Sequence, residues 1–77
     1  MRAKLSLRPL MAEAFRMKGR IAMAQGNARK AAVGFERSLQ INPGHIATYA
    51  LIAEALKISG DSKEAQRFRK LERRLTQ

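Results

Sequence analysis

Two stretches of this 77-residue chain, GNARKAAVGF at residues 26–35 and GDSKEAQRFR at residues 60–69, follow one plan. Each begins with a glycine followed by Asn or Asp, and each continues with apolar residues at helical spacing. Glycine is common just after a helix, and Asn and Asp are common just before the next one. Each stretch therefore predicts a tight turn that joins two helices.

Working outward from these turns, the chain divides into four segments of helical length. Gly26-Asn27, Asn42-Pro43-Gly44 and Gly60-Asp61 provide the breaks. Apolar residues recur every three or four positions within each segment, and no useful length alternates with period two. The predicted helices cover about Pro9–Gln25, Ala28–Ile41, Pro43–Ser59 and Ser62–Thr76. Short connections between amphipathic helices predict antiparallel hairpins, so we expect an all-α fold of two such hairpins.

The capping residues agree with these predicted helix ends. Asn42 offers a side-chain oxygen, and Pro43 lacks the N–H that a first helical turn leaves unbonded, so this pair predicts the start of the third helix. Asp61, with Glu64 three residues later, is similar to a capping box at the start of the fourth. Gly60 suits the position just after the third helix.

The two hairpins also repeat each other in sequence. A shift of 34 residues places Gly26 on Gly60 and Ala31 on Ala65. The same shift pairs Asn27 with Asp61, Phe15 with Tyr49, Gly19 with Ala53 and Met17 with Leu51. A 34-residue helix-turn-helix unit with the pattern W-x2-L-G-x2-Y, A-x3-F and P defines the tetratricopeptide (TPR) repeat, which this sequence resembles over about residues 12–77.

The first repeat, residues 12–45, carries most of the TPR pattern in Phe15, Gly19, Ala31, Phe35 and Pro43. Lys18 and Ala22 stand where Leu and Tyr are expected. The second repeat, residues 46–77, agrees through its first helix with Tyr49, Ile52, Ala53 and Leu56, and then departs with Arg69, Glu72 and Arg73. Residues 1–11 are expected to form an extension or a partial capping helix. Small residues such as Gly19 and Ala65 are expected to let helices approach closely.

The resemblance implies a function as well as a fold. TPR hairpins stack as a right-handed superhelix, and a concave groove lined by the first helix of each repeat binds a peptide without catalysis, cofactor or metal. The groove positions carried over to this chain are Glu13, Arg16, Arg20, Met23, Ala47, Ala50, Glu54 and Lys57. Arg16, Arg20 and Lys57 make that groove partly cationic, so an acidic protein or peptide is the expected partner.

Composition limits the possible functions. Sixteen Lys and Arg against six Asp and Glu give a net charge of +10, and the chain has no cysteine and one histidine, His45. A chain this small buries only about 60% of its unfolded surface, so it is not expected to enclose a catalytic cleft. The absence of disulfide or thiolate chemistry favours a reducing, cytoplasmic setting, although the Arg-rich and acid-poor first thirty residues leave an organelle presequence open.

Two repeats are fewer than the three usually needed for independent stability. The sequence therefore predicts a longer array, a cap formed by residues 1–11, or pairing between chains. The self-association residues would be Phe68, Leu71 and Leu75, which gives a homo-oligomer. The main alternative function is nucleic-acid binding through the last helix, with an anionic membrane surface as a weaker one. The cations concerned are Lys63, Arg67, Arg69, Lys70, Arg73 and Arg74.

Overall fold

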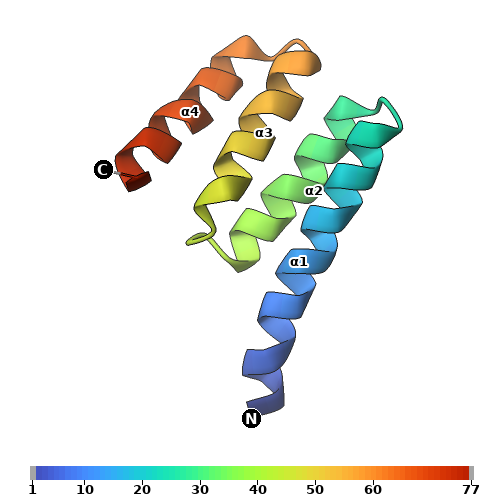
Figure 1. Ribbon diagram of the computed structural model, residues 1–77, viewed down its shortest axis with the longest axis vertical. Helices are drawn as coiled ribbons and strands as arrows, with labels where there is room; N and C mark the ends of the chain where they lie inside the picture. Colours follow the sequence, from blue (N-terminus) through green and yellow to red (C-terminus); the bar gives the residue numbers. More distant parts are fainter. Residues whose placement is uncertain (1, 77) are drawn as a thin grey trace.

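The computed structural model describes the backbone of residues 2–76 and the side chains of residues 8–76. It contains four helices, α1 (Arg2–Ala24), α2 (Ala28–Ile41), α3 (Ile46–Ile58) and α4 (Ser62–Thr76). They lie side by side in chain order and form a thin body of 41 × 33 × 13 Å (Figure 1). Extensive contacts join α1 to α2, α2 to α3 and α3 to α4. The predicted all-α arrangement of two hairpins is confirmed.

The first helix is longer than the sequence predicts. α1 begins at Arg2, and Pro9 lies inside it, so the predicted start at Pro9 is wrong. A proline in a helix removes one backbone hydrogen bond and crowds the carbonyl four residues earlier. In α1 the helix continues on both sides of that defect, and residues 2–11 extend α1 toward the N-terminus as part of the same helix (Figure 1).

The junction between α2 and α3 also differs from the prediction. Asn42 ends α2, where its backbone N–H donates to the carbonyl of Ser38 at 2.9 Å, so it does not cap α3. His45 is the residue that precedes α3, and its Nδ1 lies 2.8 Å from Oγ1 of Thr48. The predicted start of α3 at Pro43 is therefore wrong, because the preceding helix has already used the backbone of Asn42.

The turns inside the two hairpins share one hydrogen-bonding pattern. In each, the glycine N–H donates to a carbonyl three residues earlier, and the next N–H donates to a carbonyl five residues earlier, which is the Schellman motif. The bonds join Gly26 to Met23 at 3.0 Å, Asn27 to Ala22 at 2.8 Å, Gly60 to Lys57 at 3.1 Å and Asp61 to Leu56 at 2.8 Å. The 34-residue repeat of the sequence is thus a repeat of backbone geometry at these turns.

Side chains then cap the helices that follow these turns. Oδ1 of Asn27 accepts the N–H of Lys30 at 3.1 Å, and Oδ1 of Asp61 accepts the N–H of Glu64 at 3.4 Å. The predicted capping role of Asp61 is confirmed. The predicted place of Gly60, just after α3, is confirmed as well, and its φ is +96°.

Gly60→Ala is expected to destabilise the protein by about 1–2 kcal/mol, because a side chain makes this left-handed conformation unfavourable. For a domain of this size, that corresponds to a fall in Tm of very roughly 4–16 °C. Gly44→Ala is the matched control, since Gly44 has no positive φ and an added Cβ comes no nearer than 3.7 Å to its neighbours. Thermal unfolding followed by circular dichroism measures both; equal Tm values would contradict the role of Gly60.

The α1–α2 hairpin is packed backbone to backbone. A Cβ added at Gly19 would lie 2.5 Å from the ring of Phe35, and one added at Gly34 would lie 3.1 Å from the backbone of α1 at Gly19 and Phe15. The predicted role of Gly19 in close helix packing is confirmed. Gly34 performs the same role from α2, and the sequence analysis did not single it out.

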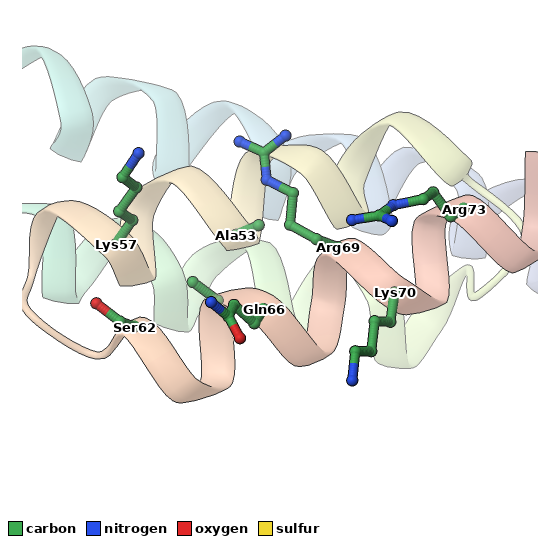
Figure 2. Close-up of a pocket in the computed structure, with 8 residues that line it drawn as sticks. Ala53, Lys57, Ser62, Gln66, Arg69, Lys70 and Arg73 are labelled. Atoms are coloured by element: carbon green, nitrogen blue, oxygen red, sulfur yellow. The ribbon is translucent and has the colours of Figure 1, made fainter.

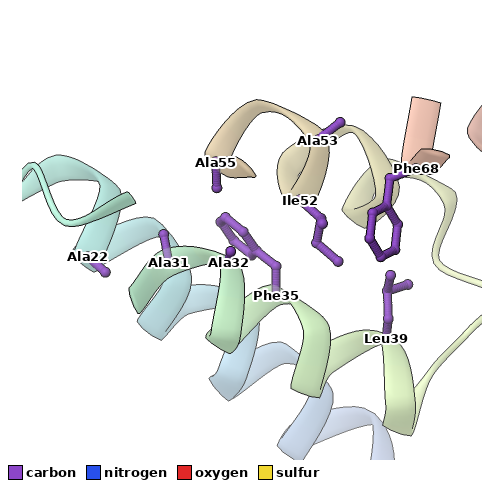
Figure 3. Packing of buried hydrophobic residues seen from close by; sticks show 9 residues of the cluster. All are labelled: Ala22, Ala31, Ala32, Phe35, Leu39, Ile52, Ala53, Ala55 and Phe68. Carbon is purple, nitrogen blue, oxygen red and sulfur yellow. The ribbon is translucent and has the colours of Figure 1, made fainter. Parts of the chain in front are cut away.

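Phe35 lies at the centre of the core. Its side chain is 1% exposed and points from α2 toward Ala55 of α3 (Figure 3). The buried cluster consists of Ala22, Ala31, Ala32, Phe35, Leu39, Ile52, Ala53, Ala55 and Phe68. α3 therefore covers the side of the first hairpin on which Phe35 is displayed.

The second hairpin places its aromatic residue differently. After the 34-residue shift, Phe68 falls on Gly34, and Arg69 falls on Phe35. One residue corresponds to a rotation of about 100° around a helix, so the ring of Phe68 points to another side of its hairpin. Phe68 is 7% exposed, and its ring centroid lies 6.4 Å from that of Tyr49. The side of α3 and α4 that corresponds to Phe35 has no aromatic residue to fill it.

Candidate binding cleft

An open cleft lies between α3 and α4, on the side that Phe68 leaves unfilled. Its floor is formed by two small buried residues, Ala53 of α3 and Ala65 of α4. Around this floor stand the longer side chains of Lys57, Ser62, Gln66, Arg69, Lys70 and Arg73. These eight residues are called the α3–α4 cleft below.

The cleft is cationic. Four of its eight residues are Lys or Arg, and none is Asp or Glu. Lys57, Arg69 and Arg73 extend on the same side of the helix pair, whereas Lys70 points away from α3 (Figure 2). Among residues 8–76, whose side chains the structure describes, the ion pair that forms joins Arg67 to Glu64 at 3.4 Å, outside the cleft. The positive charge of the cleft is therefore not neutralised by the described part of the chain.

The internal repeat explains where the cleft comes from. Shifted back by 34 residues, most of it falls on the surface of α1 and α2 around Phe35, where α3 packs against α2. The paired positions are Ala53 with Gly19, Lys57 with Met23, Ala65 with Ala31, Gln66 with Ala32, Arg69 with Phe35 and Arg73 with Leu39. In the first hairpin these positions belong to the core or pack against it. In the second hairpin Ala53 and Ala65 remain small and buried, whereas Lys57, Gln66, Arg69 and Arg73 are polar and exposed.

The predicted groove residues do not gather in this cleft, with one exception. Lys57 lines it, whereas the others lie elsewhere on α1 and α3. Arg16 is half-buried and donates from Nη1 to Oγ of Ser38 at 3.2 Å, and Met23 packs against the core. Of the remaining groove residues, Ala50 is half-buried, and the exposed ones are Glu13, Arg20, Ala47 and Glu54. Their role as a peptide groove stays a prediction.

The three residues predicted for self-association differ in exposure. Phe68 belongs to the buried core cluster of the single chain, and its part in self-association stays a prediction. Leu71 is half-buried and packs against the same cluster, while Leu75 is 46% exposed. Only these two leucines keep apolar surface for a second chain, and their role stays a prediction.

Two surface features escaped the sequence analysis. Arg69, Lys70 and Arg73 were predicted as cations of the last helix, but not as part of a cleft in which Arg69 and Arg73 extend on the same side as Lys57. The signal was present, because the departures at positions 66, 69 and 73 all fall on one face of the repeat. The second feature is an apolar stripe along α1. Its residues are Leu10, Ala14, Met17 and Ile21, all exposed.

Comparisons with protein-family models, with curated proteins and with solved structures find no match. Where side chains are described, over residues 8–76, no three His, Cys, Asp or Glu come together as they would to hold a metal ion. None of the helices described is both long and apolar enough to cross a membrane. The cleft is thus the feature of this chain from which a function can be argued.

Proposed function

We propose that this protein is a non-catalytic interaction module that binds an acidic segment of another protein. The observation that carries the proposal is the α3–α4 cleft, in which Lys57, Arg69 and Arg73 stand over a floor of small residues with no acidic residue in the lining. Guanidinium groups bind carboxylates through paired, charge-assisted hydrogen bonds. The TPR resemblance of the sequence implies the same kind of function, peptide binding by stacked hairpins, and we propose that the chain is of this kind.

Nucleic acid is the second candidate, because the six cations of α4 are all exposed. Two observations favour a protein partner over nucleic acid. Single-stranded nucleic acids usually stack their bases on exposed aromatic side chains, yet Phe68 is buried and the hydroxyl of Tyr49 donates to the carbonyl of Pro43 at 2.9 Å. The cations also point to opposite sides of α4, as Arg69 and Lys70 show (Figure 2).

Fluorescence anisotropy with labelled probes tests the proposal at about 150 mM salt. The probes are an acidic peptide containing Glu and Ala, the same peptide with Gln in place of Glu, and a single-stranded DNA oligomer. We expect the acidic peptide to bind at least about tenfold more tightly than the Gln peptide, which corresponds to about 1.4 kcal/mol. Tighter binding of the DNA oligomer would overturn the proposal in favour of nucleic acid.

A charge-reversal variant tests the location. Lys57→Glu/Arg69→Glu/Arg73→Glu is expected to weaken binding of the acidic peptide by about 100-fold, because three attractive contacts become repulsive. Lys63→Glu/Arg67→Glu/Arg74→Glu changes the net charge equally at exposed positions outside the cleft, and we expect it to weaken binding far less. Equal losses in the two variants would show that general attraction, not the cleft, holds the peptide.

The same binding experiment also tests the predicted groove of α1 and α3. Arg16→Glu/Arg20→Glu alters two cations of α1, both of which lie outside the α3–α4 cleft. If the cleft is the binding site, this pair leaves the affinity within a few-fold of the wild-type value. A loss as large as that of the cleft variant would move the site to the groove of α1 and α3.

A further inference from the structure

The first hairpin shows what kind of element can pack on a surface like that of the cleft. α3 lies against α2 of the first hairpin and covers Phe35, while the ring of Phe68 from α4 lies next to Leu39 (Figure 3). Phe35, Leu39 and the buried Ala31 correspond, 34 residues later, to Arg69, Arg73 and Ala65 of the cleft. The same surface of the second hairpin is therefore shaped by the same backbone plan, and in the first hairpin its occupant is a helix.

The charge of the cleft excludes one obvious occupant, the α1 helix of a second copy. In α3 the residue that docks at the centre of this interface is Ile52, which is fully buried. Its counterpart in α1 is Lys18. A second copy docked by the same geometry would bury Lys18 near Arg69 and Arg73, and an uncompensated buried charge costs several kcal/mol. Copies of this chain are thus poorly suited to stack end to end.

A helix of the opposite charge meets both requirements of the surface. Ala53 and Ala65 form a buried floor that lets a helix backbone come close, as small residues do at helix contacts. Lys57, Arg69 and Arg73 stand beside that floor and extend on one side (Figure 2). A helix with a narrow apolar face toward the alanines, and with Asp or Glu three and four residues apart along its edge, would satisfy both.

We propose that the α3–α4 cleft binds one acidic amphipathic helix of a partner protein, which packs against α4 as α3 packs against α2. This inference rests on the proposed function and adds the conformation and the placement of the partner segment. It assigns Lys57, Arg69 and Arg73 to the carboxylates of that helix and the two alanines to its apolar face.

Three peptides of one composition test the conformation. The first arranges Glu and small apolar residues on separate faces of a helix as long as α3, 13 residues. Each of the three peptides also carries one proline, which in the first two stands at an end. The second peptide has the residues of the first in an order that mixes the two faces. In the third, the proline is moved to the centre, where it interrupts the helix. We expect the first to bind about tenfold more tightly than the others, and to gain helical circular dichroism when it binds.

A steric variant tests the placement without changing charge. Gln66→Trp puts a large side chain into the cleft, and Gln40→Trp puts one on the exposed side of α2 as a control. We expect Gln66→Trp to weaken binding of the first peptide by about tenfold, and the control to leave it nearly unchanged. The circular dichroism of each free variant verifies that it is folded.

The outcomes separate this inference from the proposed function. If all three peptides bind equally and none gains helix, the cleft binds acidic chains in extended form, so the inference fails and the proposed function stands. If no acidic peptide binds more tightly than its Gln counterpart, both fail. If a DNA oligomer competes with the first peptide and binds more tightly, the cleft is a nucleic-acid site and the inference is wrong.

Discussion

Phe35→Ala is expected to remove a large part of the stability of this protein. Truncation of a buried phenylalanine to alanine costs about 3–5 kcal/mol, and a chain of this length has a total stability of about 4–12 kcal/mol. Phe35 is the central side chain of the core and connects α2 to α3 as well as to Gly19 of α1. Denaturant and thermal unfolding, followed by circular dichroism, measure the loss.

Phe15→Ala is the matched control for this prediction. Phe15 is only half-buried, and Lys18 and Arg37 lie over its ring at 5.5 Å from the centroid. The same change of side chain is therefore expected to cost about 1–2 kcal/mol there, because less apolar surface is lost from the interior. Similar losses at positions 15 and 35 would contradict the central place of Phe35 in the core.

A change of the cleft to the residues of the first hairpin is expected to produce assembly of the chain with itself. The variant Gln66→Ala/Arg69→Phe/Arg73→Leu restores the apolar surface that α3 covers, and Lys18→Ile supplies the matching helix face. Head-to-tail contacts that do not close into a ring produce open filaments. Light scattering should therefore show a mass that rises steadily with concentration, over at least several chain masses.

Two controls separate the causes of this assembly. The three cleft substitutions with Lys18 retained should assemble much less, because each contact would bury an ammonium group. Lys18→Ile alone should leave the mass unchanged, since Arg69 and Arg73 still occupy the acceptor surface. If the fourfold variant folds but keeps the mass of the wild-type protein, the correspondence between the cleft and the α1–α2 surface is wrong.

The sequence predicted the turns within the hairpins better than the helix ends elsewhere. Gly60 and Asp61 act locally, through a left-handed φ and a side-chain oxygen, and both act as expected. Pro9 and Asn42 were misjudged because their effects depend on what surrounds them. A proline ends a helix only where the helical turns on either side of it are not stable. Asn42 lies between two helices, and the sequence alone does not say whether it ends the first or begins the second.

The candidate site was less predictable than the fold. The cations at 69 and 73 are visible as departures from the repeat, so the polarity of this surface could be read from the sequence. The displacement of the aromatic residue from position 69 to position 68 is equally visible. Its consequence is not, because only the packing of Phe68 against Tyr49 shows that the ring leaves one side of the hairpin open.

Every extensive contact between helices in this chain joins sequence neighbours, α1 with α2, α2 with α3 and α3 with α4. Such an arrangement is nearly one-dimensional, so folding requires few distant segments to meet and is expected to be fast. Stability should also be graded along it. The inner helices α2 and α3 each have two packed neighbours, and their amides should exchange with solvent most slowly. Exchange should be faster in α4, where one side has no neighbour, and a helix bound in the cleft should slow it there first.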